Sequence, residues 1–168
     1  ERLGSAESVF ERADYTYNID HHISNTGFAD VNIVNGAASS ACEVVYEIIS
    51  KFVDIDKDIA TALYTGLLTD TGGFRHNCTS ERTHQIAGKL VALGVDTPEI
   101  HTKFLMEHSL TEAKIFARAI SKMELKNKIA YTYVTKEDME SCSASPKNLD
   151  AIVGYLLNTE GAEVSIFA

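Results

Sequence analysis

Apolar residues follow two different periods along this 168-residue chain, and the order of the two periods restricts the fold. Residues 14–20 alternate between apolar and polar types, which predicts a strand that ends at Asp20. A second short strand is expected at 30–34. Residues 38–53 and 57–69 instead carry apolar side chains at helical spacing. Strands followed by amphipathic helices are typical of an α/β fold with a parallel sheet.

The pattern changes again after residue 123. Helices are expected at 80–93, from Thr97-Pro98 onward, and at 109–123, where Ser109 and Glu112 form a capping box. The remaining chain then predicts a strand at 129–133, a short polar helix or a loop at 136–142, a helix at 147–158 and a strand at 162–167. We therefore expect a helix-rich α/β part over residues 1–108, a linker helix over 109–123, and the start of a second, smaller α/β domain over 124–168.

The charge balance limits the ways in which this chain can attract phosphates. It carries 15 basic and 24 acidic side chains, and its formal net charge is −9. An acidic protein binds nucleic acid poorly through bulk charge, because nonspecific affinity depends on cations that release counterions. If the chain acts on phosphates, bound metal ions are the expected source of positive charge.

The three cysteines, Cys42, Cys78 and Cys142, are far apart and form no CxxC pair. This spacing argues against a disulfide framework and against a four-thiolate zinc site, and it favours a reducing, cytoplasmic setting. No apolar run approaches the ~20 residues that a membrane-spanning helix needs. We therefore expect no membrane partner.

The sequence Asp20-His21-His22 stands at the end of the first predicted strand. Ligands of open α/β sheets gather beyond the carboxyl ends of the strands. Imidazole and carboxylate groups together suit Mn, Fe or Zn, and adjacent histidines can divide their work between metal and substrate. The alternative interpretation is that three polar residues close a strand in a solvated turn.

Asp70 ends an apolar helix just before Gly72-Gly73. A carboxylate is unfavourable at this negative pole of the helix dipole, and a metal ion would offset the cost. The alternatives are a solvated carboxylate or an aspartate that initiates a turn. Arg75 follows the turn and presents a planar fork that suits phosphate oxygens, although a surface arginine is the simpler interpretation.

Three segments together resemble the DHH-family phosphoesterases. They are 18–25 (Asn-Ile-Asp-His-His-x-x-Asn), 38–43 (Ala-Ser-Ser-Ala-Cys-Glu) and 66–75 (Gly-Leu-Leu-Thr-Asp-Thr-Gly-Gly-Phe-Arg). The resemblance is greatest to the bacterial branch of short-oligonucleotide exonucleases that also dephosphorylate pAp, and it covers essentially the whole chain. It implies a parallel sheet flanked by helices in residues 1–108, as the C-terminal part of a DHH domain, and the N-terminal part of a DHHA1-type substrate-binding domain in 124–168.

The resemblance also implies a two-metal phosphoesterase, usually with manganese, in which a bridging hydroxide attacks phosphorus. His21 and Asp70 correspond to metal ligands, and Asp20 to a weaker ligand or to a residue that holds His21 in its tautomer. The implied catalytic group is Asp20, His21, His22 and Asp70. The implied substrate contacts are His22, Asn25 and Arg75. Ser39 and Ser40 either cap a helix or offer donors to an anion.

The sequence departs from the family pattern at both ends. The family's first Asp/His-rich strand end, a further metal-binding Asp and a Gly-rich, His-containing substrate loop have no counterpart in these 168 residues. We therefore expect the segment alone to be inactive and the full-length protein to be active. The expected partner is a short single-stranded RNA or DNA, or a nucleotide, and a homodimer stays open. A cyclic dinucleotide phosphodiesterase or pyrophosphatase of the same fold, or a noncatalytic nucleotide-binding module, are the alternatives.

Lys114, Arg118 and Lys122 recur every four residues along the helix predicted at 109–123. They form either a cationic rail for a nucleic-acid backbone or an ordinary solvated helix face.

Overall fold

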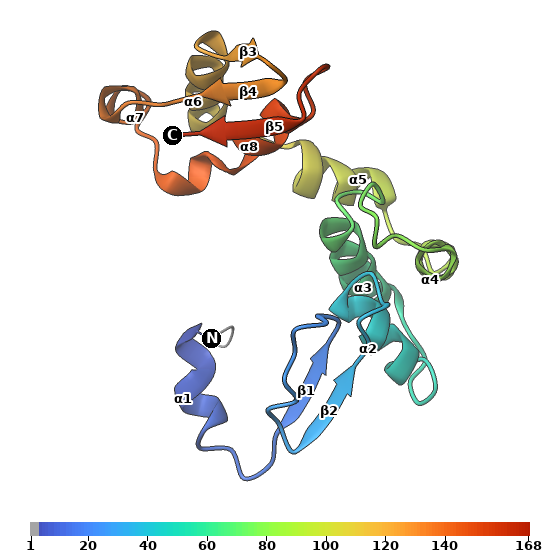
Figure 1. The fold of residues 1–168 in the computed structure, drawn as a ribbon. Helices are drawn as coiled ribbons and strands as arrows, with labels where there is room; N and C mark the ends of the chain where they lie inside the picture. The colour runs from blue at the N-terminus through green and yellow to red at the C-terminus, as the bar shows by residue number, and fades with distance from the viewer. Residues whose placement is uncertain (1–3) are drawn as a thin grey trace. The chain divides into compact units, whose positions relative to one another are not determined.

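The structure is a computed structural model that describes residues 4–168, and Figure 1 shows its course. The chain divides into two compact units, with the boundary between Met106 and Glu107. No helix among the described residues is long and apolar enough to cross a membrane.

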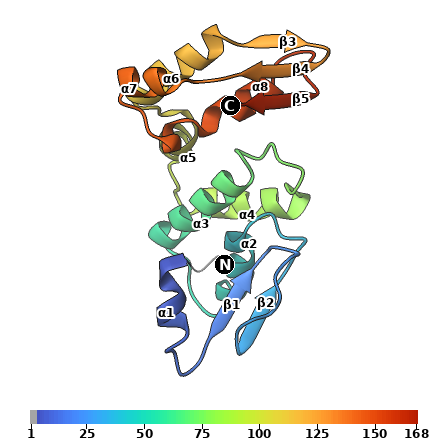
Figure 2. The same ribbon diagram turned by 60° about the vertical axis from the view of Figure 1, so that its left-hand side comes forward.

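The first unit contains the parallel strand pair that the alternating pattern predicts. After a 3₁₀ turn, Gly4–Ala6, and a short helix α1, Glu7–Phe10, the strands β1 (Tyr17–Asp20) and β2 (Val31–Val34) pair in parallel. They lie side by side in Figure 1 and Figure 2. The strand β1 starts later than the expected residue 14. Just before it, the backbone N–H of Thr16 donates to the side-chain Oδ2 of Asp30 at 2.8 Å instead of to a neighbouring strand.

Helices occupy the rest of this unit, as their apolar stripes predict. They are α2 (Ala41–Ile49), α3 (Lys57–Asp70), α4 (Glu81–Ala92) and α5 (Thr97–His101), and α5 continues into a π-helical turn, Thr102–Met106. Polar side chains accept a hydrogen bond from the first turn of each α-helix from α2 to α5, and these N-caps are Ser40, Asp56, Ser80 and Asp96. Caps of this kind fix where a helix begins, since they satisfy N–H groups that have no partner within the helix.

The core of the first unit is built mainly by α2, α3 and α4. Leu67 and Leu68 of α3 are fully buried within it. Gly66 brings α3 close to α2, because a Cβ at this position would lie 2.2 Å from the Sγ of Cys42. The close packing fixes the C-terminal end of α3, where Asp70 stands.

The second unit is the smaller α/β structure that the pattern after residue 123 predicts. Its elements are α6 (Leu110–Ser121), β3 (Glu124–Lys126), β4 (Ile129–Thr132), α7 (Lys136–Cys142), a 3₁₀ turn (Pro146–Asn148), α8 (Asp150–Leu157) and β5 (Val164–Phe167). Its strands run in the order β3-β4-β5, with β3 antiparallel and β5 parallel to β4. The helix α8 connects the two parallel strands.

The helix that we expected as a linker takes part in the core of this unit. Ala119 of α6 is buried with Ala130, Ile152 and Leu156. Arg118 Nη1 of α6 lies 3.5 Å from Asp138 Oδ1, and the Nζ of Lys122, the residue that follows α6, donates to Asp138 Oδ2. Two of the three cations are therefore paired with an aspartate of α7, which argues against a rail that is free for nucleic acid, and they do not lie on a simply solvated helix face either.

Candidate metal centre

The strand end and the helix end that the sequence singles out meet in the structure. His21 directly follows β1, and Asp70 is the last residue of α3. The Nε2 of His21 lies 3.4 Å from the Oδ2 of Asp70. Two potential metal ligands from separate elements thus face each other in the first unit.

The orientation of the His21 ring follows from its other nitrogen. The Nδ1 of His21 lies 3.3 Å from the carbonyl oxygen of Ala38, just before α2. A carbonyl oxygen only accepts hydrogen bonds, so the neutral ring carries its proton on Nδ1 and its lone pair on Nε2. That lone pair faces a carboxylate oxygen, and a cation between the two groups would stabilise the pair.

The donor pair fits a divalent transition metal. Bonds of about 2.0–2.1 Å to one ion place two neighbouring ligand atoms about 3.0–3.4 Å apart, and the observed separation is 3.4 Å. An imidazole nitrogen beside a carboxylate oxygen is a donor set that Mn, Fe and Zn accept. His21 and Asp70 are therefore the two residues that we assign as candidate ligands.

Asp20 supports the site rather than completing the ligand pair. Its Oδ1 accepts hydrogen bonds from the backbone N–H of His21 at 2.7 Å and from the Nδ1 of His22 at 2.6 Å, and its Oδ2 accepts from the Nδ2 of Asn25 at 2.6 Å. The expectation that Asp20 holds His21 in its tautomer is wrong, because the ring that bonds to Asp20 is that of His22. Ala38 performs this task for His21.

These contacts also set the charge of Asp20. Partial burial alone would raise the pKa of its carboxyl group, but hydrogen bonds from Asn25 and His22 outweigh burial and hold the pKa well below its usual range. One ligand atom from each of Asp20, His21 and His22 lies within 4.8 Å of the others. Both oxygens of Asp20 are already engaged, so we regard it as an orienting residue.

Two of the three expected substrate contacts, His22 and Asn25, line one hollow, and Arg75 is not among its lining residues. A pocket of about 800 Å³ is bordered by Asn18, Asp20, His22 and Asn25 together with residues of α1 and of the loop after β1. Asn25 is held in place, since it accepts a hydrogen bond from Asn18 Nδ2 at 2.9 Å. Pockets of this size accommodate small molecules such as nucleotides.

The turn after α3 has an unusual backbone. Gly72, Gly73 and Phe74 are consecutive and have φ angles of 57°, 73° and 65°. Glycine adopts this left-handed region freely, whereas at Phe74 it costs about 1–2 kcal/mol. The turn closes on itself, because the Nε of Arg75 donates to the carbonyl of Gly72 at 2.9 Å and the Nδ1 of His76 donates to that of Asp70 at 3.1 Å.

With this geometry established, comparison with known proteins gives a family. Residues 4–67 match the family described as "DHH family, N-terminal domain", and the matched region contains the Asp20-His21-His22 motif. This match assigns residues 4–67 to a DHH-type domain.

Curated relatives and a solved structure extend the match beyond the DHH domain. The chain is 29% identical over 154 residues to the "bifunctional oligoribonuclease and PAP phosphatase NrnA" of Thermus thermophilus, which covers 91% of this chain and 46% of the relative. It is 27% identical to the Bacillus subtilis protein of the same name, over 89% of this chain and 49% of the relative. The chain therefore spans about half the length of these relatives.

An exopolyphosphatase-related protein from Bacteroides fragilis has the same fold. Its crystal structure superposes with a TM-score of 0.85 at 24% identity, covering 96% of this chain and 48% of that protein. This similarity supports the arrangement of elements that we describe for the chain.

Ser39 and Ser40, which lie within the matched DHH domain, serve the fold. Ser40 caps α2, where its side chain accepts from the backbone N–H of Glu43, and Ser39 Oγ donates to Glu43 Oε2 at 2.6 Å. Thr83 of α4 donates to the same carboxylate oxygen at 3.0 Å. Glu43 was not among the predicted site residues, although its place three residues after Ser40 matches a capping pattern that could have revealed it.

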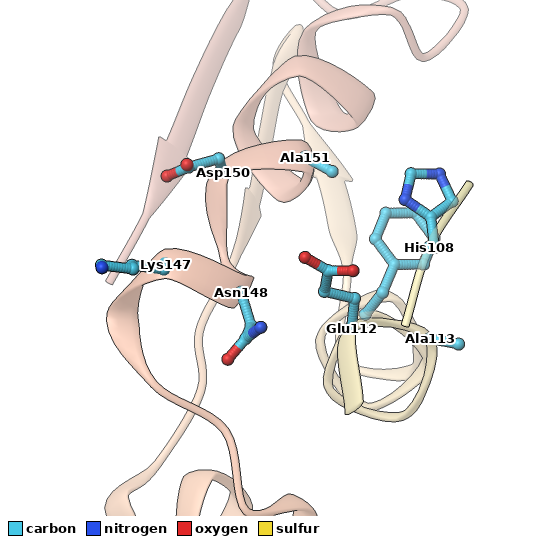
Figure 3. Close-up of a pocket in the computed structure, with 8 residues that line it drawn as sticks. His108, Glu112, Ala113, Lys147, Asn148, Asp150 and Ala151 are labelled. Atoms are coloured by element: carbon cyan, nitrogen blue, oxygen red, sulfur yellow. The ribbon is translucent and has the colours of Figure 1, made fainter. Parts of the chain in front are cut away.

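A second pocket lies within the second unit, and none of its lining residues is a site residue that the sequence predicts. It has a volume of about 390 Å³ and is bordered by α6 and by the chain around the start of α8. Figure 3 shows Glu112 and Asn148 projecting into the space between these elements, while Lys147 and Asp150 point away from α6. Its charged groups are of both signs, so the lining favours no charge in a ligand.

Proposed function

We propose that the protein is a manganese-dependent phosphoesterase that hydrolyses short oligonucleotides or nucleotide phosphates such as pAp. The observation that carries the proposal is the facing pair of His21 Nε2 and Asp70 Oδ2, 3.4 Å apart, beside a pocket of nucleotide size. The match of residues 4–67 to a DHH-type domain and the names of the NrnA relatives support this choice of substrate. Because the chain covers half of those relatives, the activity is proposed for the protein at its full natural length.

His21 and Asp70 would hold the metal in this proposal. Manganese, when bound, supplies positive charge to the phosphate oxygens and makes water a better nucleophile. The carbonyl of Ala38 keeps the lone pair of His21 Nε2 directed at Asp70. Asp20 holds the ring of His22 through Nδ1, which leaves the Nε2 of His22 directed away from Asp20 for a contact with substrate.

The proposed contacts to substrate are His22, Asn25 and Arg75. The side chain of His22 is 42% exposed, so a ligand can reach it. The guanidinium of Arg75 uses its Nε within the turn, which leaves two Nη groups for phosphate oxygens. The free thiols of all three cysteines fit the cytoplasmic location that we propose along with this substrate class.

A substrate panel tests the proposal. The full-length protein is incubated with Mn²⁺ and, in separate reactions, pAp, short oligonucleotides, cyclic dinucleotides and pyrophosphate. We expect turnover of pAp and short oligonucleotides that a chelator abolishes and added Mn²⁺ restores. Hydrolysis of cyclic dinucleotides or pyrophosphate alone would move the protein to another substrate class, and nucleotide binding without hydrolysis of any substrate would indicate a noncatalytic module.

Two variants connect the activity to the site. His21→Ala and Asp70→Ala each remove one candidate ligand and should abolish Mn²⁺-dependent turnover. The matched controls are His108→Ala and Asp54→Ala, which remove the same groups from outside the site and should retain activity. Near-normal turnover in either site variant contradicts the assignment.

A further inference from the structure

We propose that Phe74 is a positioning residue whose ring anchors the left-handed turn after α3 and thereby holds the guanidinium of Arg75 ready for a substrate phosphate. The inference rests on the proposed function, since it takes Arg75 as a phosphate contact. It gives a role to Phe74, a residue of the 66–75 segment to which neither the resemblance nor the metal geometry assigns one.

The backbone of Phe74 needs an explanation. Among the described residues, four that are not glycine have a positive φ, and they are Phe74, Asn127, Lys128 and Ser143. Asn127 and Lys128 form the turn between β3 and β4, and Ser143 follows the end of α7, which are places where chains commonly reverse or helices stop. Phe74 is the bulky apolar member of the group, and such residues adopt this conformation only where their surroundings impose it.

The surroundings of Phe74 do impose it. Its ring packs edge-on against Tyr64, with centroids 6.0 Å apart, and lies 5.2 Å from the ring of His84 on α4. Tyr64 is only 5% exposed and belongs to the core, so the ring of Phe74 rests on a rigid wall. The backbone N–H of Phe74 donates at 3.0 Å to the hydroxyl of Thr71, which is fully buried.

Arg75 directly follows the anchored residue and is hydrogen-bonded to the same turn. The backbone N–H of Arg75 donates to the carbonyl of Thr71 at 2.9 Å, and its Nε donates to the carbonyl of Gly72 at 2.9 Å. The backbone N–H groups of Gly72 and Gly73 donate to carbonyls of α3. Since the backbone amides of the turn are engaged internally, the Nη groups of Arg75 are what the turn offers an anion.

The same turn also reaches Asp70, the candidate ligand. The Nδ1 of His76 donates to the carbonyl of Asp70 at 3.1 Å. The turn that Phe74 anchors therefore begins at a candidate metal ligand, Asp70, and contains Arg75. A guanidinium held at a fixed place loses less entropy when it binds phosphate than one on a free side chain. Phe74 thus supplies preorganisation to the proposed phosphate contact.

The first test measures the turn without any substrate. Solvent exchange of the Arg75 Nε proton is followed by NMR and compared with that of the exposed Arg12. We expect exchange at Arg75 to be slower by about tenfold or more, because its Nε is hydrogen-bonded. Phe74→Ala and Phe74→Gly should bring it to the rate of Arg12, whereas Phe74→Tyr keeps the ring and should keep the protection.

Two comparisons keep this test decisive. Phe52→Ala is the matched control, because it removes a phenyl ring that is 81% exposed in the same unit, and it should leave the exchange unchanged. Phe74→Leu keeps apolar volume but lacks the flat ring, and it serves if the smaller variants do not fold. Protection of the Arg75 proton that persists in Phe74→Leu, Phe74→Ala or Phe74→Gly overturns the proposal.

The second test asks whether Phe74 acts through Arg75. In a double-mutant cycle on kcat/KM for pAp, Phe74→Ala and Arg75→Ala should each lower the value by about tenfold or more, as the loss of a charge-assisted hydrogen bond implies. The double variant should match Arg75→Ala within about twofold, since the ring then has no guanidinium to hold. Additive losses, close to the product of the two single effects, would show that Phe74 acts by another route.

The two tests separate the failure of this inference from the failure of the proposed function. If the wild-type protein hydrolyses no substrate of the panel, the proposed function fails, while the exchange measurement still decides whether Phe74 holds Arg75. If the protein is active and Phe74→Ala changes neither the exchange nor kcat/KM, the proposed function stands and the role of Phe74 is refuted.

Discussion

Replacing Glu43 by Ala should weaken both the first unit and the candidate metal centre, although Glu43 is not a ligand. Its side chain is 3% exposed, and its Oε2 accepts hydrogen bonds from the backbone N–H of Ser39, from the hydroxyl of Ser39 and from the hydroxyl of Thr83. Ser39 directly follows Ala38, whose carbonyl faces the Nδ1 of His21. The carboxylate therefore supports the residue that orients one proposed ligand.

The magnitude follows from the donors that Glu43→Ala leaves behind. The hydroxyl of Thr83 has another partner, Ser80 Oγ at 3.0 Å, whereas the two donors of the fully buried Ser39 lose the partner that they share. Each buried polar group left unsatisfied costs about 1–3 kcal/mol. We therefore expect the free energy of unfolding to fall by about 2–5 kcal/mol.

The assay combines urea denaturation with a Mn²⁺ titration of the folded protein. Loss of a residue that orients a metal ligand typically lowers metal affinity about 10–100-fold, and we expect Glu43→Ala to fall in that range. Glu47→Ala is the matched control, since Glu47 lies on the same helix and pairs with Arg82 of α4 at 3.1 Å, but at the surface. Glu47→Ala should lower the free energy of unfolding by about 0–1 kcal/mol and leave Mn²⁺ affinity unchanged. If Glu43→Ala lowers the free energy of unfolding by less than about 1 kcal/mol, or leaves Mn²⁺ affinity unchanged, Glu43 does not support the site in this way.

Three further predictions concern packing and charge. Hydrogen bonds from Lys122 and Thr135 lower the pKa of Asp138, so ionised Asp138 stabilises the fold above the unfolded pKa of about 3.9, and this stabilisation is lost as the pH falls below that value. Asp138→Asn should therefore make the free energy of unfolding, measured by urea denaturation, depend less steeply on pH in the acid range, and an unchanged slope contradicts the pairing. Gly66→Ala should lower the free energy of unfolding by about 1–3 kcal/mol, because the added Cβ clashes with the Sγ of Cys42. In thermal melts, adding Cys42→Ala should partly restore the stability of Gly66→Ala, and independent effects of the two substitutions would argue against the contact. Arg118→Gln should change oligonucleotide affinity by no more than about twofold, because this arginine already pairs with Asp138. A salt dependence of binding that is reduced by about one ion would instead support the interpretation as a cationic rail.

The order of elements in the first unit is largely predictable from the sequence, because period-two and helical stripes are local signals. The meeting of His21 and Asp70 agrees with the interpretation of their motif. Strand β3 was not expected, since three residues, Glu124–Lys126, are too few to establish an alternation. The π-helical turn after α5 likewise has no marker in the sequence.

The details of the site depend on burial and on side-chain orientation, which a sequence does not display. A strand end that carries Asp20, His21 and His22 does not reveal which ring the carboxylate will hold, and the structure selects His22. Ser39 looks like an anion donor until Glu43 is seen to occupy it. At Phe74 the paired glycines predict a turn, but the left-handed backbone of the third residue depends on contacts with α3 and α4.

Anomalous diffraction from crystals of the full-length protein soaked in Mn²⁺ shows whether His21 and Asp70 share one metal ion. We predict an anomalous peak about 2.0–2.3 Å from both His21 Nε2 and Asp70 Oδ2, which is the range of bonds to nitrogen and oxygen ligands. The peak should disappear in crystals of Asp70→Ala grown and soaked in the same way. A manganese ion bound elsewhere, with His21 and Asp70 paired directly to each other, would contradict the account.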